Sequence, residues 1–277
     1  FFEKNQIDEP NLSNWLDLVA LGTIADVVPL DRNNRILVQN GLLRMRAGRV
    51  RPGIKALCES ADRSLDRLSA ADLGYGLGPR LNAAGRLDDI SVGIKCLLAD
   101  ELAEARAYAK TLGDLNQTRR QIEQDMSTEA LMIMSEVPTD LSGITLYDPN
   151  WHQGVIGIVA SRMREKYHRP VVVFADSGVG SAKLIKGSGR SVSRVHIRDA
   201  FENIATRNPG LIETFGGHAM AAGLTIKRIH LELFSNAFSK EVELQADERD
   251  LRGIALSDGE LAESELVLES ALQIAQF

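Results

Sequence analysis

The spacing of apolar residues predicts helices over the first half of this chain. Helical runs are expected between residues 12 and 98, each with a capping residue or a terminating glycine: Leu12–Leu21 ending at Gly22, Asn34–Arg46 ending at Gly48, Ser69–Leu77 and Val92–Leu98. One long helix then follows over 100–135, with apolar residues three, four and seven apart. Its stripe is expected to pack on both flanking parts of the chain. Arg119 lies on this stripe, so its stem should follow the interface and its guanidinium should reach a carboxylate or phosphate.

From residue 143 the pattern becomes that of an α/β unit. Gly143–Tyr147 and Pro170–Phe174 are expected to be parallel strands, joined through a helix over Val155–Tyr167 by a right-handed crossover. The loop 148–154 follows the first strand and opens that helix, a place where open α/β sheets bind ligands. From the residues alone, His152 in this loop is interpreted as an ordinary loop histidine.

The following segments complete the predicted mixed sheet. Residues 183–193 are expected to form a pair of strands around Gly187-Ser188-Gly189. A helix over Arg198–Thr206, a strand over Ala221–Ile226 and an amphipathic helix over Leu231–Leu244 come next. The fold class is therefore α/β, with a helical first part, a connector helix and a sheet-containing second part.

Composition is that of a water-soluble protein with room for two hydrophobic cores. The chain has 277 residues, of which 44% are hydrophobic, and no apolar run approaches the length of a membrane span. The first five residues do not have the pattern of a signal peptide. Cys58 and Cys96 stand far apart and are expected to be free buried thiols. A cytoplasmic location without membrane attachment is predicted.

The charge is unevenly distributed along the chain. Residues 241–277 contain ten acids against Arg249 and Arg252, a net of −8, so the total of −6 leaves about +2 on residues 1–240. Two basic runs have no acid within them: Arg44, Arg46, Arg49, Arg51 and Lys55, and Lys183, Lys186, Arg190, Arg194 and Arg198. Such runs are ordinarily solvated surfaces. Their position beside glycine-rich motifs favours a track for nucleic-acid phosphates.

Two short motifs carry candidate chemistry. Gly216-Gly217-His218 places a titratable ring beside glycines that permit close backbone approach, although a simple turn would also use this pattern. Asp26 interrupts an apolar run and, if buried, needs a cation, a metal ion or a capping role. A helix cap near Asp31, an ion pair with Arg35 and a metal site all remain open. No His-x-His, Asp-His-His or His-Glu-x-x-His cluster accompanies it.

Four motifs in a fixed order resemble a known family. They are Gly22 to Leu30, Gly78-Pro79-Arg80-Leu81-Asn82-Ala83-Ala84-Gly85-Arg86, Gly187-Ser188-Gly189-Arg190-Ser191, and Gly216 to Leu224. The chain resembles RecJ, a family of single-strand-specific 5′ exonucleases in the DHH phosphoesterase superfamily, from about residue 10 to its end. The family's Asp-x-Asp and Asp-His-His motifs are absent. The resemblance implies the end of a DHH catalytic domain at 1–99, a connector at 100–135, a DHH-associated domain at 136–246 and an incomplete oligonucleotide-binding barrel at 247–277.

The resemblance also implies roles for individual residues. Asp26 and His218 would be the catalytic residues. Asp26 would be a ligand of two Mn²⁺ or Mg²⁺ ions, and His218, with Gly216 and Gly217, would hold the terminal phosphate. Further phosphate contacts are implied for a set of polar residues: Asn82, Arg86, Gln117, Arg162, Ser188 and Arg190. Gln117 could instead face solvent, and Arg162 could pair with Glu165.

The implied function is that of part of a metal-dependent exonuclease. Such an enzyme degrades single-stranded DNA from 5′ to 3′, releases mononucleotides in recombination and repair, and works with single-strand-binding protein and a helicase. The chain alone is expected to lack activity, because it shows one metal ligand. Two alternatives stay open: a DHH phosphoesterase for short oligoribonucleotides or bisphosphonucleotides, and a non-catalytic nucleic-acid-binding module like the C-terminal domain of alanyl-tRNA synthetases.

Overall fold

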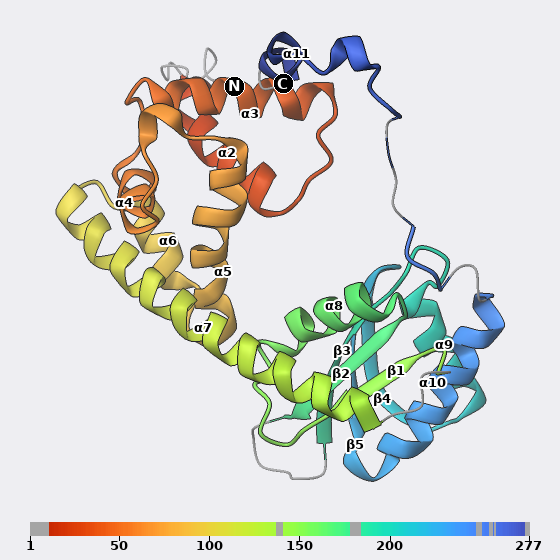
Figure 1. Cartoon of the computed structure of the whole chain (residues 1–277). Coiled ribbons are helices and arrows are strands. Elements are labelled where there is room, and N and C mark those ends of the chain that lie inside the picture. The colour runs from red at the N-terminus through yellow and green to blue at the C-terminus, as the bar shows by residue number, and fades with distance from the viewer. Residues whose placement is uncertain are drawn as a thin grey trace, which may run out of the picture.

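Two units joined by one long helix make up the chain (Figure 1). The computed structural model describes residues 11–136, 141–177, 184–247, 251–254, 257 and 259–274. The connector α7 (Leu102–Glu136) has 35 residues, which corresponds to about 50 Å of helix. Ala109 and Leu112 belong to the core of the helical unit, whereas Met126 and Ala130 belong to a core of the α/β unit. The predicted connector that packs on both units is thereby confirmed.

The helical unit consists of short helices around one apolar core. Its elements are η1 (Leu12–Trp15), α2 (Leu16–Ala25), α3 (Arg32–Arg46), α4 (Pro52–Ser60), η2 (Leu65–Arg67), η3 (Asp72–Leu77), α5 (Gly78–Leu87) and α6 (Ser91–Leu98). Capping residues, a proline and a glycine determine where several of these helices begin or end. The side chain of Asp31 accepts a hydrogen bond from the Asn34 amide, Pro52 occupies the first position of α4, and Gly48 follows α3 with φ of 76°.

Two details of the helical unit differ from the sequence prediction. Helix α2 does not stop at Gly22 but continues to Ala25, because an exposed glycine weakens a helix without ending it. The chain turns only at Val27, which has φ of 54°. The motif around Pro79 and Asn82 forms helix α5, which was not predicted. The expected capping by Ser69 is confirmed, since its hydroxyl accepts from the Asp72 amide at 3.2 Å, and the turn that follows is a π-helix.

The α/β unit contains a five-stranded mixed sheet in the order β1-β2-β3-β5-β4. Its elements are β1 (Ile144–Tyr147), α8 (Ile156–Tyr167), β2 (Val171–Asp176), β3 (Leu184–Arg190), α9 (Ile197–Arg207), β4 (Ile212–Gly217), β5 (Ala221–Lys227), η4 (Arg228–His230) and α10 (Leu231–Gln245). Strands β1 and β2 are parallel, as predicted, and the remaining neighbours are antiparallel. A pair of strands was expected around Gly187. This prediction is wrong for the described residues, because Leu184–Arg190 form the single strand β3. Strand β4, which contains Gly216 and Gly217, was not predicted.

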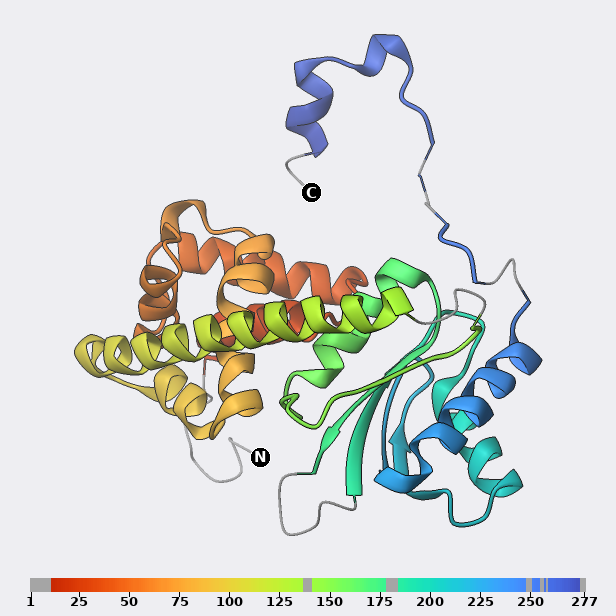
Figure 2. The same ribbon diagram turned by 60° about the horizontal axis from the view of Figure 1, so that its bottom comes forward.

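The two faces of this sheet are covered by different helices (Figure 2). Helices α9 and α10 cover one face, with Phe174, Phe201 and Phe234 in its core. Helix α8 covers the other face over β2 and β3, where Val171 and Val173 of β2 lie. Gly187 and Gly189 are required in β3, since a β-carbon at either would come within 2.5 Å of an aromatic or aliphatic side chain of the first face.

The last described residues contain two short helical elements, η5 (Glu263–Glu265) and α11 (Leu268–Ile274). Within the segment 247–277, where the resemblance implies an incomplete oligonucleotide-binding barrel, residues 248–250, 255, 256, 258 and 275–277 lie outside the described residues. The expected barrel segment at 247–277 therefore stays a prediction. Within the described ranges, no helix has the length and apolar character needed to cross a bilayer.

Candidate nucleic-acid interface

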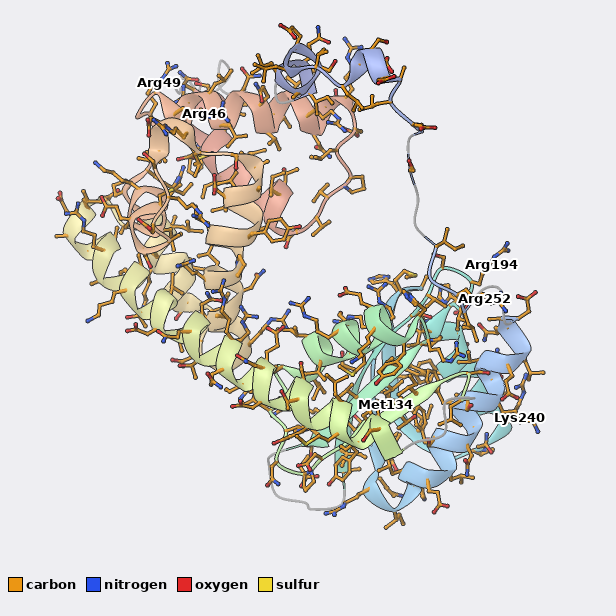
Figure 3. All side chains as sticks on the ribbon, viewed as in Figure 1. Arg46, Arg49, Met134, Arg194, Lys240 and Arg252 are labelled. Carbon is orange, nitrogen blue, oxygen red and sulfur yellow. The ribbon has the colours of Figure 1, made fainter. Side chains whose placement is uncertain are left out.

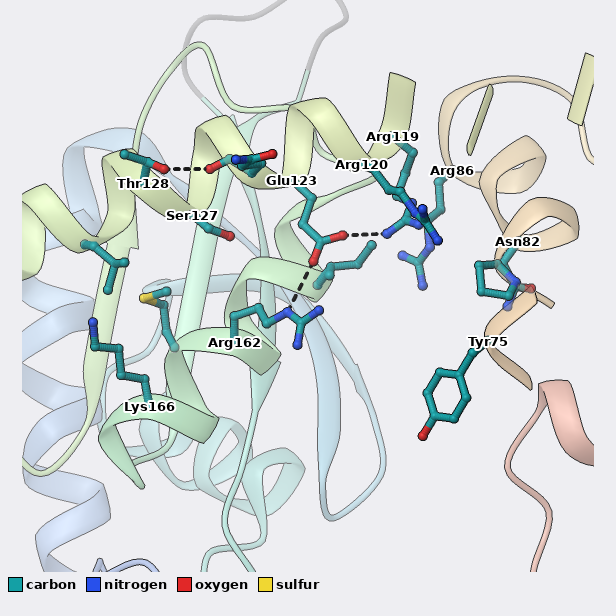
Figure 4. Close-up of a pocket in the computed structure, with 15 residues that line it drawn as sticks. Tyr75, Asn82, Arg86, Arg119, Arg120, Glu123, Ser127, Thr128, Arg162 and Lys166 are labelled. Atoms are coloured by element: carbon teal, nitrogen blue, oxygen red, sulfur yellow. Dashed lines mark hydrogen bonds and ion pairs between the residues drawn. The ribbon is translucent and has the colours of Figure 1, made fainter. Parts of the chain in front are cut away.

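A cleft of about 900 Å³ lies between α5, α7 and α8, where the two units meet (Figure 4). Its positively charged lining residues come from all three helices: Arg86, Arg119, Arg120, Arg162 and Lys166. Among the described residues, Glu123 is the only acid that lines it. Asn82 and the exposed ring of Tyr75 stand at the α5 side. Five cations against one carboxylate give the described lining an excess of positive charge, which attracts anions.

Glu123 occupies the wall formed by α7 and pairs with two arginines. Its Oε2 lies 2.5 Å from Nη1 of Arg119, one turn earlier on α7, and its Oε1 lies 3.2 Å from Nε of Arg162 on α8. Nη2 of Arg119 donates to Asn116 Oδ1 at 2.8 Å. Burial lowers the pKa of the Arg119 guanidinium and the Glu123 charge opposes that shift. The Glu123 carboxylate therefore links the connector helix α7 to α8 of the α/β unit through an ion pair.

The loop 148–154 makes two further contacts across the junction. Nη1 of Arg86 donates to the carbonyl oxygen of Gly154 at 3.1 Å, and Nε1 of Trp151 donates to Glu129 on α7 at 2.7 Å. A β-carbon at position 154 would lie 2.1 Å from the Arg86 carbonyl oxygen, so only glycine fits this approach. The loop thus sets the position of Arg86 at the edge of the cleft.

Arg190 and Ser188 lie on β3 under the first turn of α8. Nη1 of Arg190 donates to Ser188 Oγ at 3.0 Å and to the Gly189 carbonyl oxygen at 2.8 Å. Both side chains would contact a β-carbon at Gly157, so α8 begins directly over them. Burial lowers the pKa of Arg190, and the charges of Arg86 and Arg164 lower it further. In the described part of the chain, no carboxylate pairs with Arg190, so an anion would relieve this repulsion.

Beyond α8, the same face of the sheet is uncovered over β5, β4 and the Lys186 end of β3. Its side chains line up in paired rows of small and polar residues: Ser188 with Gly223 and Gly216, and Lys186 with Thr225 and Thr214. We call these six residues, together with Arg190, the open half of the sheet. A shallow groove of about 290 Å³ lies on the part of it formed by Lys186, Thr214, Gly216, Gly223 and Thr225. Its glycine floor would let a chain approach the protein backbone.

The Gly-Gly-His motif turns at the end of the open half that carries Arg190. The His218 amide donates to the Ala221 carbonyl oxygen at 2.8 Å, and the Ser191 amide donates to the Met220 carbonyl oxygen at 3.0 Å. Gly217 has φ of 140°, which favours glycine. The His218 side chain is exposed. The structure thus brings Gly216, Gly217, His218, Ser188 and Arg190 to one end of the sheet.

Asp26 is exposed, so the premise of a buried carboxylate is wrong. An apolar run predicts burial only where another element covers it, and Val27 beside it is 85% exposed. The residue follows the last turn of α2, where its amide donates to the Gly22 carbonyl oxygen at 3.0 Å. Asp31, not Asp26, caps α3. In the described ranges, no ion pair joins Asp26 to Arg35, and no group of three or more His, Cys, Asp or Glu side chains could hold a metal ion.

Other candidates divide between the cleft and the outer surface. Asn82, Arg86 and Arg162 line the cleft, whereas Gln117 is exposed on α7 and does not. Arg162 lies 3.8 Å from the expected partner Glu165 but closer, at 3.2 Å, to Glu123. The Nδ1 atom of His152 accepts from the Gly154 amide at 3.1 Å, which supports its interpretation as a loop histidine.

The two basic runs do not form one continuous track. Arg46 and Arg49 lie on the helical unit, far from Arg194 on the α/β unit (Figure 3). Within the first run, Arg46 donates to the Leu68 carbonyl oxygen and Arg51 pairs with Asp17. Both contacts lie within the helical unit and stabilise its fold. In the second run, Lys183 lies outside the described residues, and Lys186 and Arg190 belong to the open half of the sheet.

Sequence reasoning missed several residues of the cleft: Tyr75, Arg120, Glu123 and Lys166. Helical spacing alone could have paired Arg119 with Glu123, which are four residues apart. The pairing of Glu123 with Arg162 joins residues 39 positions apart and depends on the packing of α8 on α7.

Comparisons with known proteins agree with this architecture. The sequence model of the DHHA1 domain matches residues 140–244. The single-stranded-DNA-specific exonuclease RecJ of Escherichia coli is 52% identical over 275 residues, which are 98% of this chain and 47% of that protein. RecJ of Bacillus subtilis is 33% identical over 245 residues, 85% of this chain and 30% of that protein. The chain thus spans about half the length of the Escherichia coli relative.

A solved structure shares the same arrangement of elements. The crystal structure of Thermus thermophilus RecJ in complex with Mg²⁺ superposes with a TM-score of 0.75 at 32% identity, covering 89% of this chain and 36% of that one. The corresponding complex with Mn²⁺ also gives a TM-score of 0.75. The likeness includes both units and their connection, since it covers most of the chain.

Proposed function

The chain belongs to the RecJ family of single-stranded-DNA-specific exonucleases, and from this premise we propose that it forms the strand-binding part of such an enzyme. Single-stranded DNA lies in the cleft and across the open half of the sheet. One observation carries this proposal: Arg190 is held under α8 beside the charges of Arg86 and Arg164, without a carboxylate partner among the described residues. A phosphate bound at Arg190 would offset the repulsion that the charges of Arg86 and Arg164 exert on its guanidinium.

The terminal phosphate of the strand is placed at the Arg190 end of the open half. Arg190 and Ser188 supply a charged donor and a hydroxyl, and His218 with the backbone of Gly216 and Gly217 closes the other side. A guanidinium suits this role because it can donate two parallel hydrogen bonds to one phosphate.

The following phosphates are placed along the cleft. Arg86 reaches the cleft from α5 with its position fixed by Gly154, and Asn82 lies one turn earlier on the same helix. Arg162 faces them from α8. Gln117, exposed on α7 outside the cleft, is proposed as a further contact only at the end of this track.

Metal ions are present in RecJ structures from Thermus thermophilus, in complex with Mg²⁺ or Mn²⁺. The described residues of this chain do not fit a two-ion site, because Asp26 is exposed and no cluster of ligands surrounds it. Asp26 is proposed as a single ligand, and no hydrolytic step is assigned to the chain alone. Residues 1–277 should therefore bind a single strand without cleaving it. Degradation of a 5′-labelled strand in Mn²⁺ that disappears on Asp26→Ala would contradict this.

The proposal for the whole enzyme rests on the family alone. The whole enzyme is proposed to be a cytoplasmic 5′-to-3′ exonuclease that needs Mn²⁺ or Mg²⁺. It would release mononucleotides from single-stranded DNA during recombination and repair. Its partners on that DNA would be single-strand-binding protein and a helicase. A phosphoesterase for short oligoribonucleotides or bisphosphonucleotides is less well supported. The cleft of about 900 Å³ and the separate groove of about 290 Å³ together exceed what a dinucleotide needs.

The proposal is tested by fluorescence anisotropy with a 5′-phosphorylated oligothymidylate at two salt concentrations. The strand should bind more tightly than its 5′-hydroxyl counterpart, and His218→Ala should reduce that difference. Binding should weaken with salt, as phosphate contacts require. Salt-sensitive binding that ignores both changes would support the alternative of a general nucleic-acid-binding module, and no binding would refute the proposal.

A further inference from the structure

We propose that Glu123 is a positioning residue that holds Arg162 in the orientation needed to contact a phosphate in the cleft. This inference rests on the proposed function. It assigns a role to Glu123, the one acid among the described residues that line the cation-rich cleft, where simple electrostatics would exclude an acid.

The geometry of Glu123 is that of a bridge between two elements. Its two carboxylate oxygens contact different arginines, with Oε2 on Arg119 of α7 and Oε1 on Nε of Arg162 of α8. The Glu123 residue is only 9% exposed, whereas the Arg162 side chain is 62% exposed. The buried carboxylate thus holds the base of a guanidinium whose outer face reaches the solvent of the cleft (Figure 4).

The contact leaves the phosphate-binding edge of Arg162 available. Glu123 is hydrogen-bonded to Nε, while Nη1 lies 3.8 Å from Glu165, beyond hydrogen-bond distance. The terminal nitrogens can therefore donate to a ligand without breaking the bridge. An arginine fixed in this way loses less side-chain entropy on binding than a free one.

Two possible roles for Glu123 predict opposite changes in the affinity for a single strand. If it only adjusts the charge of the cleft, Glu123→Gln makes the cleft more positive and should tighten binding. If it positions Arg162, the same change should weaken binding in spite of the added positive charge. We expect a loss of about threefold to tenfold, the range that corresponds to ordering one long side chain.

The experiment measures the affinity of the whole chain for a 5′-phosphorylated oligothymidylate by fluorescence anisotropy. Asp125→Asn is the matched control, because it removes the same charge from an exposed residue two positions away on α7 that does not line the cleft. It should leave the affinity unchanged or slightly tighter. In an Arg162→Gln background, Glu123→Gln should lose most of its effect, since both changes remove the same contact.

Each outcome of these affinity measurements either supports or overturns the positioning role of Glu123. Equal or tighter binding by Glu123→Gln, or a full effect in the Arg162→Gln background, would overturn the positioning role while leaving the proposed function intact. A wild-type chain that does not bind would overturn both. If Glu123→Gln does not fold, Arg162→Lys replaces it: the charge stays but the Nε contact cannot form, so binding should fall about as far as in Arg162→Gln. Affinity equal to the wild type would then refute the inference.

Discussion

The two faces of the sheet in the α/β unit show how one set of strands serves two purposes. On the face covered by α9 and α10, the rings of Phe174, Phe201, Phe234 and Phe238 pack with centroids 5.4 to 6.1 Å apart. On the opposite face, the open half carries Arg190, Ser188 and a glycine floor. Alternation along each strand makes this possible, because neighbouring residues point to opposite faces.

Strand β3 shows the difference most directly. Gly187 and Gly189 point into the aromatic core, where a side chain would collide, whereas Lys186, Ser188 and Arg190 point to the open half. Stability and binding are therefore assigned to alternate residues of one strand. Substitutions on the two faces should separate these properties.

The largest expected effect is on the covered face. Phe234 is fully buried and contacts three other phenylalanine rings, so Phe234→Ala should lower the free energy of unfolding by about 3–5 kcal/mol. Urea unfolding followed by circular dichroism measures this. The fraction that stays folded should bind a single strand with unchanged affinity. A well-folded variant with weakened binding would show that the two faces are coupled.

A smaller loss is expected where the loop 148–154 meets α5. Gly154→Ala places a β-carbon 2.1 Å from the Arg86 carbonyl oxygen, which should cost about 1–3 kcal/mol and weaken strand binding. Gly216→Ala is the contrasting variant, since nothing lies within 4 Å of its β-carbon. It should keep its melting temperature but bind less tightly, because the methyl group occupies the floor of the groove. Equal loss of stability in both variants would argue against this distinction.

Arg190→Ala should weaken single-strand binding about tenfold, as expected for losing a charged contact, with a salt dependence flatter by about 0.7 in the log–log slope. The control is Lys240→Ala, which removes an exposed cation from α10. Anisotropy titrations at several salt concentrations compare the two. An equal effect of both substitutions would mean that total charge, and not the open half, governs binding.

The smallest effect is expected for the reactivity of the two cysteines in the core of the helical unit. Burial raises the pKa of Cys58 to about 12 and that of Cys96 to about 11, so both thiols stay protonated in the folded chain. A disulfide reagent at pH 8 should react with them only as fast as the chain unfolds, and the rate should rise with urea. Rapid reaction of the native chain would show that this core opens readily.

The sequence allowed the regular elements to be predicted better than the cleft. Helices with strong periodicity and capping, such as α3 and α10, were found within about two residues of their ends. Strand β4 was missed because Gly216 and Gly217 are poor strand formers, and its pairing with β5 supplies the stability that local propensity lacks. Element type thus followed from local pattern wherever tertiary contacts did not override it.

The site was predictable only in part. Motif resemblance pointed to Arg86 and Arg190, and the structure places both beside the loop or helix that fixes them. Asp26 was expected to be buried and is exposed, because burial depends on what covers a segment. Glu123 could not be assigned from sequence, since its second partner lies on a helix that only the fold brings near.

Hydrogen–deuterium exchange of the chain, with and without a 5′-phosphorylated oligothymidylate, tests most directly whether the strand lies on the open half and in the cleft. Exchange should slow in β3, in the turn around His218 and in the first turns of α8, and should stay unchanged in α9 and α10. Protection confined to α9 and α10, or no protection anywhere at saturating strand, would contradict this account.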